Sequence, residues 1–485
     1  MNLDSLIVQP QVDTTRQWSP YQQAIFDALT STKSNIIVEA VAGSGKTTTL
    51  VEGVNRVAIA EPHAEILVLA FNKSITVELQ QRLPSTVTAS TFHSLGLSTF
   101  PSRPKYLAGK CRKILKEILP AQVYEDHARD ILRMVSLAKS CVGMVDFDKL
   151  LSDFDVSIPP EIERLAMDAA RSTLQQSIKN RKQIDFDDML FLPVLLDFKF
   201  PTFDYIFVDE LQDLNSIQHH FIKLLLKSTG RVIGVGDTHQ AIYAFRGADV
   251  NSMNHFREEF DPLELPLSIS YRCPKSVVRW AQHIVPHIQY APDAEEGETS
   301  FLRPTGDFKV EDCTVDDLIV CRNNAPLFRL ALRFIRLGKP VYVRGNFGEQ
   351  LVSFIKGFKT QNIDVLEQRL KAWYEAEVKL LAAREQESKI GYITDKYNSL
   401  LVIVEQSDTV EDCLNTIINL VTPNAGTVLS SIHRAKGTEA KRVYFYAPSL
   451  LPSKWAKSPA ALQQEQNLRY VAGTRALSQL YFVEE

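Results

Sequence analysis

The chain has 485 residues, which at roughly 150 residues per domain predicts about three domains, or two large domains with insertions. Its composition, 45% hydrophobic and 23% charged, excludes disordered, collagenous and coiled-coil chains. The formal net charge of −4 gives no global basic signature, so any nucleic-acid contact needs a local groove. No apolar stretch is long enough for a membrane span, and the N-terminal stretch lacks a signal-peptide pattern, which predicts a soluble cytoplasmic protein without a membrane partner.

Eight short apolar runs alternate with stretches of helical character. The first four lie at 35–39, 66–71, 205–208 and 231–236, and the second four at 317–321, 341–343, 427–431 and 442–446. Continuous apolar strands separated by helices are typical of a parallel sheet covered by helices on both faces. The sequence therefore predicts an α/β protein with two such cores in tandem.

Two helical blocks interrupt these cores. The block at 104–188 carries Lys105, Lys110, Arg112, Lys113 and Lys116, which fit either a solvated helix face or a DNA-facing one. Residues 363–389 contain neither Gly nor Pro and place apolar side chains at helical spacing, which indicates a packing face. The six cysteines lack metal-site spacing, which favours reduced thiols over zinc, iron–sulfur or disulfide roles.

Residues 40–47 (AVAGSGKT) follow the first predicted strand and open a helix. In this setting backbone N–H groups can surround a phosphate, Lys46 can reach the β- and γ-phosphates, and the Thr47 hydroxyl can hold Mg²⁺. Ala40 replaces the first glycine of the general pattern, and a chance glycine-rich turn is the alternative. The segment predicts a phosphate-binding loop.

A matching acidic pair follows the strand at 205–208. Asp209 is suited to a metal shell, and Glu210 to activating a water as general base. Strand ends are where α/β folds place their chemistry. A helix N-cap cluster is the alternative, but the pair fits better as the partner of the phosphate-binding loop.

Residues 235–248 (VGDTHQAIYAFRGA) form a long motif that few folds share, and with the two preceding elements the chain resembles the UvrD/Rep-like helicases of superfamily 1A. Further motifs follow the family's order: 19–22 (SPYQ), 70–73 (AFNK), 91–94 (TFHS), 270–272 (SYR), 431–439 (SIHRAKGTE) and 470–476 (YVAGTRA). Within this family, the residues found in the motifs at 70–73, 91–94 and 243–248 are most similar to those of the branch that contains F-box DNA helicases and small phage or bacterial relatives.

The resemblance implies two tandem RecA-like P-loop motor domains with mainly helical insertions. Motor domain 1A would comprise 1–99 and 191–264, and motor domain 2A would comprise 265–353 and 426–485. The 1B insertion would span 100–190, and a short 2B insertion would span 354–425.

The resemblance also implies ATP and Mg²⁺ as cofactors. Gln22 would read the adenine edge, and Tyr271 would stack on its face. Gln240 would sense the γ-phosphate, and Arg272 and Arg475 would neutralise charge on the transferred phosphoryl group. Metal binding would fall to Thr47 and Asp209. The remaining nucleotide-binding residues would be Ala42, Gly43, Ser44, Gly45, Lys46, Thr48, Gly437 and, near the ribose, Glu439.

Single-stranded DNA would cross both motor domains, with bases stacking on aromatic faces and phosphates meeting basic side chains. For each aromatic residue, a place in the core is the alternative. The candidates on the first motor domain are Phe71, Asn72, His93, Tyr243, Phe245 and Arg246, and those on the second are Arg322, Asn323 and His433.

Two departures from the family pattern bear on the activity. Thr48 stands where relatives often carry an arginine beside the adenine. The sequence ends at Glu485, soon after Arg475, so we expect the usual C-terminal strand-separating pin to be missing. We therefore expect the 1B insertion to supply any duplex wedge, or the protein to be mainly a translocase.

The motifs predict an ATP-dependent DNA helicase or translocase that acts on single-stranded DNA or at single-strand/duplex junctions, and the family resemblance implies movement from 3′ to 5′. The second interpretation is the motor subunit of a nuclease, recombination or phage-defence complex, with a nuclease, recombination or single-strand-binding protein as partner. A small-molecule P-loop enzyme is the third, and DNA would not change its ATPase rate.

Overall fold

The computed structural model describes residues 9–143, 145–153, 156, 158–159, 161–243, 251–303, 308–383 and 387–484. The chain divides into two compact units. The first contains Met1–Ala40 and Gly45–Ser268, and the second contains Val41–Ser44 and Ile269–Glu485. Among the described helices, none is long and apolar enough to cross a membrane.

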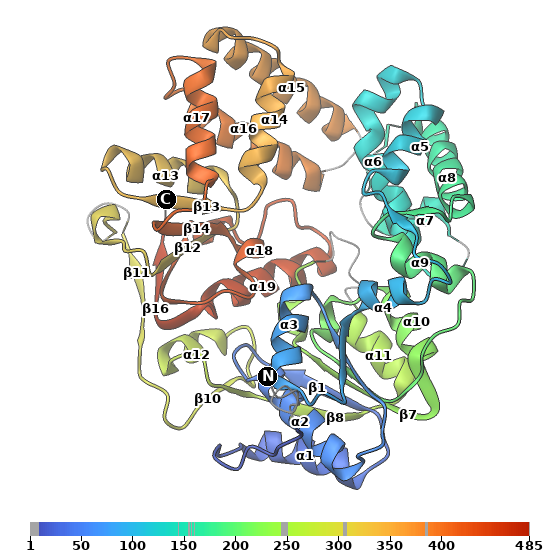
Figure 1. Cartoon of the computed structure of the whole chain (residues 1–485). Helices are drawn as coiled ribbons and strands as arrows, with labels where there is room; N and C mark the ends of the chain where they lie inside the picture. Colours follow the sequence, from blue (N-terminus) through green and yellow to red (C-terminus); the bar gives the residue numbers. More distant parts are fainter. Residues whose placement is uncertain are drawn as a thin grey trace, which may run out of the picture. The chain divides into compact units, whose positions relative to one another are not determined.

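Six parallel strands form the sheet of the first unit, in the order β3-β2-β6-β7-β1-β8 (Figure 1). Neighbouring residues of β1 face opposite sides, so Ile37 packs in one core and Ile36 and Val38 pack in the other. The strands are β1 (Ile36–Ala40), β2 (Ile66–Ala70), β3 (Thr88–Thr91), β6 (Phe203–Val208), β7 (Leu226–Gly236) and β8 (Leu263–Leu267).

Helices cover both faces of this sheet, as the continuous apolar strands require. Two of them begin with capping boxes, in which Ser19 pairs with Gln22 and Asn215 pairs with Gln218. Outside the insertion, the helices of the unit are α1 (Pro20–Ser31), α2 (Lys46–Ala60), α3 (Lys73–Arg82), α4 (Phe92–Ser98), α9 (Asp188–Leu195), α10 (Ser216–Leu225) and α11 (Ser252–Phe260), with the short 3₁₀ turns η2 (Leu211–Asp213) and η3 (Thr238–Gln240).

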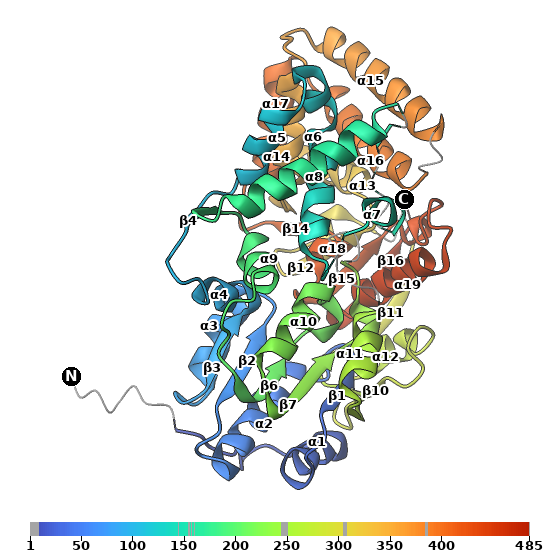
Figure 2. The same ribbon diagram turned by 90° about the vertical axis from the view of Figure 1, so that its right-hand side faces the viewer.

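A helical insertion separates α4 from α9. It contains α5 (Lys110–Ile118), α6 (Ala121–Lys139), α7 (Phe147–Asp153) and α8 (Glu163–Lys179), flanked by the short paired strands β4 (Lys105–Tyr106) and β5 (Gln183–Ile184). Figure 2 shows α5, α6 and α8 side by side, and their apolar residues are continuous with the core of the sheet. Both interpretations of Lys110 are wrong, because its side chain is buried and its Nζ lies 2.6 Å from Asp188 Oδ2.

The second unit contains another six-stranded parallel sheet, in the order β11-β16-β15-β12-β14-β13. Its central strands are again continuous apolar runs. The strands are β11 (Glu298–Leu302), β12 (Asp317–Cys321), β13 (Val341–Arg344), β14 (Thr427–Ser431), β15 (Ala440–Tyr446) and β16 (Ala476–Val483); β9 (Ile269–Ser270) and β10 (Gln289–Tyr290) pair separately. Two parallel α/β sheets in tandem confirm the predicted fold class.

Helices of the second unit include an inserted group between β13 and β14. Leu366, Leu370 and Leu381 of the predicted apolar face are buried, and the stretch at 363–389 contributes to the two helices α15 and α16. The helices are α12 (Lys275–Ala281), α13 (Ala325–Arg336), α14 (Phe347–Gly357), α15 (Ile363–Ala383), α16 (Glu387–Val404), α17 (Val410–Val421), α18 (Ile432–Ala435) and α19 (Pro459–Gly473), with the 3₁₀ turns η5 (Val310–Asp312) and η6 (Pro448–Leu450).

Candidate nucleotide and nucleic-acid sites

The loop between β1 and α2 has the backbone of a phosphate cradle. Gly43 and Gly45 take positive φ angles of 73° and 77°, which glycine adopts without a steric cost. Ser44 is fully buried, and its hydroxyl has no hydrogen-bond partner among the described residues. Lys46 and Thr47 then open the 15-residue helix α2. An unsatisfied buried hydroxyl and a helix N-terminus fit an anionic ligand such as a nucleoside triphosphate.

Strand β6 brings the acidic pair to this loop. The Thr47 hydroxyl donates to Asp209 Oδ2 over 3.3 Å, and Lys46 Nζ lies 3.4 Å from Glu210 Oε2. Burial and the neighbouring charge of Glu210 raise the pKa of Asp209 to about 6. Glu210 has a left-handed backbone (φ 53°), which is strained for a residue with a side chain and is typical of functional sites.

The end of β7 adds an amide network to the same edge. Gln240 donates to Asp237 over 2.6 Å, and the Asp237 N–H donates to the side chain of Gln212 over 2.9 Å. Gln212 in turn donates to Glu210. Burial alone would lower the pKa of Lys46, but the charges of Glu210, Asp237 and Asp209 outweigh it and raise that pKa. Lys46 therefore stays charged among three acidic groups.

Gln22 lies beside the start of α2. Its carboxamide oxygen accepts from Ser19, and its nitrogen donates to the Thr49 hydroxyl over 3.0 Å. Thr49 is also buried, and sequence reasoning missed it because its position one turn into α2 gives no motif signal. Thr48, which the sequence analysis predicted to bind the nucleotide, lies on the first turn of the same helix.

Two aromatic pairs follow the strands of the first unit. The rings of Phe71 and Tyr243 are parallel, with centroids 6.3 Å apart and planes at 5°. The ring of His93 stacks on Phe186 at 3.8 Å and 19°. Phe71 and Phe186 are exposed, with exposed fractions of 39% and 53%. Two stacked and partly exposed pairs at one edge of a sheet resemble a base-stacking platform.

One predicted DNA-binding residue of the first unit already uses its side chain within the protein. The Asn72 side chain caps α3 by accepting from the N–H of Ile75 over 2.9 Å. Phe245 and Arg246 lie outside the described residues. Phe186 was missed, although an aromatic residue among three carboxylates in the segment at 185–188 is a recognisable signal.

The candidate nucleotide residues of the second unit gather near the amino ends of β15 and β16. Arg272 Nε lies 2.6 Å from Glu439 Oε2. Arg475 is 1% exposed and donates to the carbonyls of Val471 and Thr438. Burial, together with the charge of Arg272, lowers the pKa of Arg475 to about 10, so this guanidinium stays charged at neutral pH.

Two further predicted residues of this group, Tyr271 and Gly437, have open space around them. Tyr271 is 48% exposed, which leaves its ring face available for stacking. Gly437 takes a φ of 80°, and no atom lies within 4 Å of the position that a Cβ would take there.

The opposite edge of the second sheet carries the remaining candidates. Cys321 of β12 pairs with Ser431 of β14, so Arg322 and Asn323 emerge beside the start of α18, which contains His433. Arg322 makes a bidentate contact with the buried Glu465 over 2.8 to 3.1 Å. Its predicted DNA contact would therefore use a guanidinium already held in place by a carboxylate.

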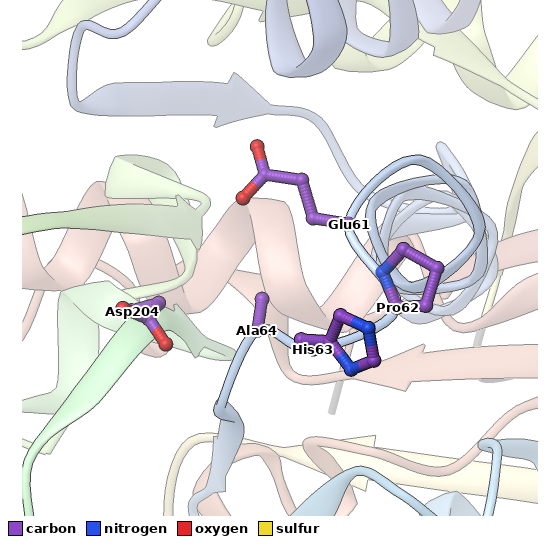
Figure 3. Close-up of a pocket in the computed structure, with 5 residues that line it drawn as sticks. All are labelled: Glu61, Pro62, His63, Ala64 and Asp204. Carbon is purple, nitrogen blue, oxygen red and sulfur yellow. The ribbon is translucent and has the colours of Figure 1, made fainter.

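A shallow hollow of about 300 Å³ lies elsewhere in the first unit, lined by Glu61, Pro62, His63, Ala64 and Asp204 (Figure 3). These residues precede β2 and begin β6, at the amino ends of the strands, away from the phosphate loop. Lys227 pairs with Asp204 over 2.8 Å, and Tyr205 donates to Glu61 over 2.6 Å. The hollow is therefore separate from the candidate nucleotide site.

A glycine-turn loop, a lysine and threonine at the start of a helix, and an Asp–Glu pair on a neighbouring parallel strand define a P-loop nucleotide-binding protein. Residues 21–261 match the UvrD/REP helicase N-terminal domain, and residues 346–484 match the UvrD-like helicase C-terminal domain. The chain belongs to the UvrD-like helicases of superfamily 1A.

The chain is also similar to curated DNA helicases over part of its length. The chain is 27% identical over 303 residues to the ATP-dependent DNA helicase PcrA of Bacillus subtilis, covering 55% of this chain and 39% of the relative. It is 24% identical over 301 residues to PcrA of Leuconostoc citreum, covering 54% and 38%. Over 294 residues it is 24% identical to PcrA of Staphylococcus aureus, covering 53% and 39%. The chain thus spans about two fifths of the length of these relatives.

Proposed function

We propose that this chain is an ATP-dependent DNA helicase or translocase that moves 3′ to 5′ along single-stranded DNA in the cytoplasm. The observation that carries the proposal is the short segment from Asp237 to Tyr243. One end of it joins Gln240 to the acidic network around Lys46, and the other end stacks Tyr243 on Phe71. A change at the nucleotide end would therefore reach the aromatic end within four residues.

In this proposal, the loop at 42–45 and Lys46 hold the phosphates of ATP, and Thr47 and Asp209 hold Mg²⁺. The metal ion would neutralise charge on the phosphates and orient them. Glu210, held by Lys46 and Gln212, takes the proton of the attacking water. Gln22 and Tyr271 bind the adenine, and Gly437 and Glu439 lie near the ribose.

The two arginines supply the remaining positive charge. Arg475 is held by backbone carbonyls, which fixes the direction of its guanidinium, whereas Arg272 is paired with Glu439 and must leave that partner to act on a phosphate. We propose that the exchange of partners by Arg272 accompanies nucleotide binding.

DNA bases stack on the first unit through Phe71, Tyr243 and His93, to which we add Phe186. Phosphates meet Arg322, Asn323 and His433 on the second unit. Asn72, Phe245 and Arg246 of the first unit are further candidate DNA contacts. The division into 1A, 1B, 2A and 2B at the predicted boundaries belongs to this proposal, as do single-strand/duplex junctions as substrates and nuclease, recombination or single-strand-binding partners.

The test is ATP hydrolysis by the purified chain with and without a single-stranded oligonucleotide. We expect strong stimulation by DNA, and a loss of about 10²- to 10⁴-fold in Glu210→Gln with nucleotide binding retained, because the general base is removed. Glu258→Gln, an exposed change on α11, is the matched control. A rate indifferent to DNA would contradict the proposal, and stimulation that requires a co-purified protein would favour the motor-subunit alternative.

A further inference from the structure

A buried ionic cluster joins the helical insertion of the first unit to the start of α9. Lys139 of α6 places Nζ 2.7 Å from Asp185 Oδ2 and 2.8 Å from Asp188 Oδ1. Lys110 of α5 places Nζ 2.6 Å from Asp188 Oδ2 and donates to the carbonyl of Ser177. The side chains of both lysines and of Asp188 are at most 1% exposed.

The two carboxylates also close the turn that carries Phe186. The Asp185 N–H donates to Asp188 Oδ2 over 3.1 Å, and the Asp188 N–H donates to Asp185 Oδ1 over 3.0 Å. The Met189 N–H donates to the Phe186 carbonyl over 3.2 Å. Phe186 therefore projects from a turn that is hydrogen-bonded in both directions across its base.

The charges of this cluster balance only when both lysines are present. Two ammonium groups contact two carboxylates directly, and burial raises the pKa of the third carboxyl group of the turn, Asp187, which favours its neutral form. A buried charge that loses its partner is costly, so we expect the turn to change conformation when a lysine is removed. Both lysines come from the insertion, and both carboxylates come from the segment that carries the aromatic residue. The insertion thus fixes the conformation of that turn.

The stacking partner of Phe186, His93, is also held in place by packing. His93 lies on α4, and the backbones of α4 and α9 approach so closely that a Cβ on Gly96 would lie 2.2 Å from the carbonyl oxygen of Met189. The stacked His93–Phe186 pair is therefore held from one side by the α4–α9 contact and from the other by the lysine cluster.

We propose that Lys139 and Lys110 are positioning residues for DNA binding, which hold the exposed ring of Phe186 in the orientation that stacks with a base. The proposal rests on the proposed DNA-dependent function. Through these lysines the insertion would contribute to the binding of single-stranded DNA. This role does not require the insertion to contact duplex DNA.

The test measures the oligonucleotide concentration that gives half-maximal stimulation of ATP hydrolysis. We expect Lys139→Met to raise this concentration about 5- to 20-fold, with little change in the rate at saturating DNA, because a misplaced ring loses part of its stacking. Phe186→Ala should raise it by at least as much. The double variant should show no further increase, because both changes remove the same interaction.

Two more variants separate positioning from general stability. Lys139→Met/Asp185→Asn removes one charge of each sign, so the remaining Lys110–Asp188 pair stays balanced, and this variant should fold and still need more DNA. Lys179→Met, an exposed lysine at the end of α8, is the control and should behave as wild type.

A purely structural role predicts a lower rate at saturating DNA with unchanged half-saturation, or effects that add to those of Phe186→Ala. Either result, or a wild-type DNA requirement in the balanced variant, would overturn the positioning role alone. Wild-type hydrolysis that ignores DNA would overturn the proposed function, and this proposal with it.

Discussion

The two parallel sheets place their candidate groups at different edges. In the first sheet, both groups follow the carboxyl ends of strands. Leu69 of β2 pairs with Val208 of β6, so the chain leaves these strands side by side toward Phe71 and Asp209. The candidate nucleotide and DNA groups of this unit are therefore neighbours along one edge.

In the second sheet, the two groups lie at opposite edges. Ala440 pairs with Ala476, so Glu439 and Arg475 lie at the amino ends of β15 and β16. Arg322 instead follows the carboxyl end of β12. A five-residue strand spans roughly 17 Å at about 3.3 Å per residue, which separates the two edges. The proposed coupling between nucleotide and DNA therefore falls to the first unit, where the segment from Asp237 to Tyr243 connects the two candidate groups.

The largest effect is expected at the amino-terminal edge of the second sheet. Arg475→Lys keeps a charge but loses the guanidinium fork, so we expect DNA-stimulated hydrolysis to fall about 10³-fold or more, as for loss of an arginine finger. Arg333→Lys, an exposed change on α13, is the control in steady-state ATPase assays. A loss of less than about tenfold would remove this edge from the nucleotide site.

The next effect sharpens the claim for the first sheet. Phe71→Ala removes the exposed ring that stacks on Tyr243, and we expect the oligonucleotide concentration for half-maximal stimulation to rise about 5- to 150-fold, the range for one base stack. Phe301→Ala removes a 77% exposed ring of β11 in the second unit and should have no such effect. Equal effects of the two substitutions would contradict the stacking platform.

A smaller effect tests the carboxyl-terminal edge of the second sheet. Arg322→Gln leaves the buried Glu465 without its bidentate partner and should lower the free energy of unfolding by about 1–3 kcal/mol, measured by urea denaturation. Arg322→Gln/Glu465→Gln should recover most of that stability and still bind single-stranded DNA more weakly. Recovery of wild-type DNA binding in the double variant would show that Arg322 supports the fold alone.

The smallest effect concerns His93. Burial lowers its pKa from 6.5 to about 4, so the unfolded chain binds more protons than the folded one between these values. Stability should therefore fall as the pH drops from 6.5 toward 4, by on the order of 1 kcal/mol once partial exposure to water is allowed for. His93→Gln should lose this dependence in melts across that window, and an unchanged dependence would exclude His93 as its source.

The sequence predicted those strands whose signal is a continuous run of apolar residues. The eight apolar runs are strands, with 317–321 and 427–431 matching β12 and β14 at both ends. The strands that were missed in the two six-stranded sheets have weaker signals, because β3 is polar, β8 contains Pro266, and β11 and β16 are only partly buried.

Long-range pairing was beyond the sequence pattern. Lys110 read as one of a row of basic residues, but its burial depends on Asp188, which lies 78 positions along the chain. The pairing of Arg322 with Glu465 has a similar origin, across 143 positions. Periodicity reports which face of a helix is apolar, and it does not report which charge on that face finds a distant partner.

Movement along DNA is the most direct test of the central claim that nucleotide and DNA groups act as one motor. Streptavidin is bound to a biotin at either end of a single-stranded oligonucleotide, and its ATP-dependent release by the wild-type chain is timed. Motion from 3′ to 5′ predicts rapid release from the 5′ end, slow release from the 3′ end, and neither with Glu210→Gln. Hydrolysis that DNA stimulates without faster release at either end would contradict the motor, and preferential release from the 3′ end would contradict its direction.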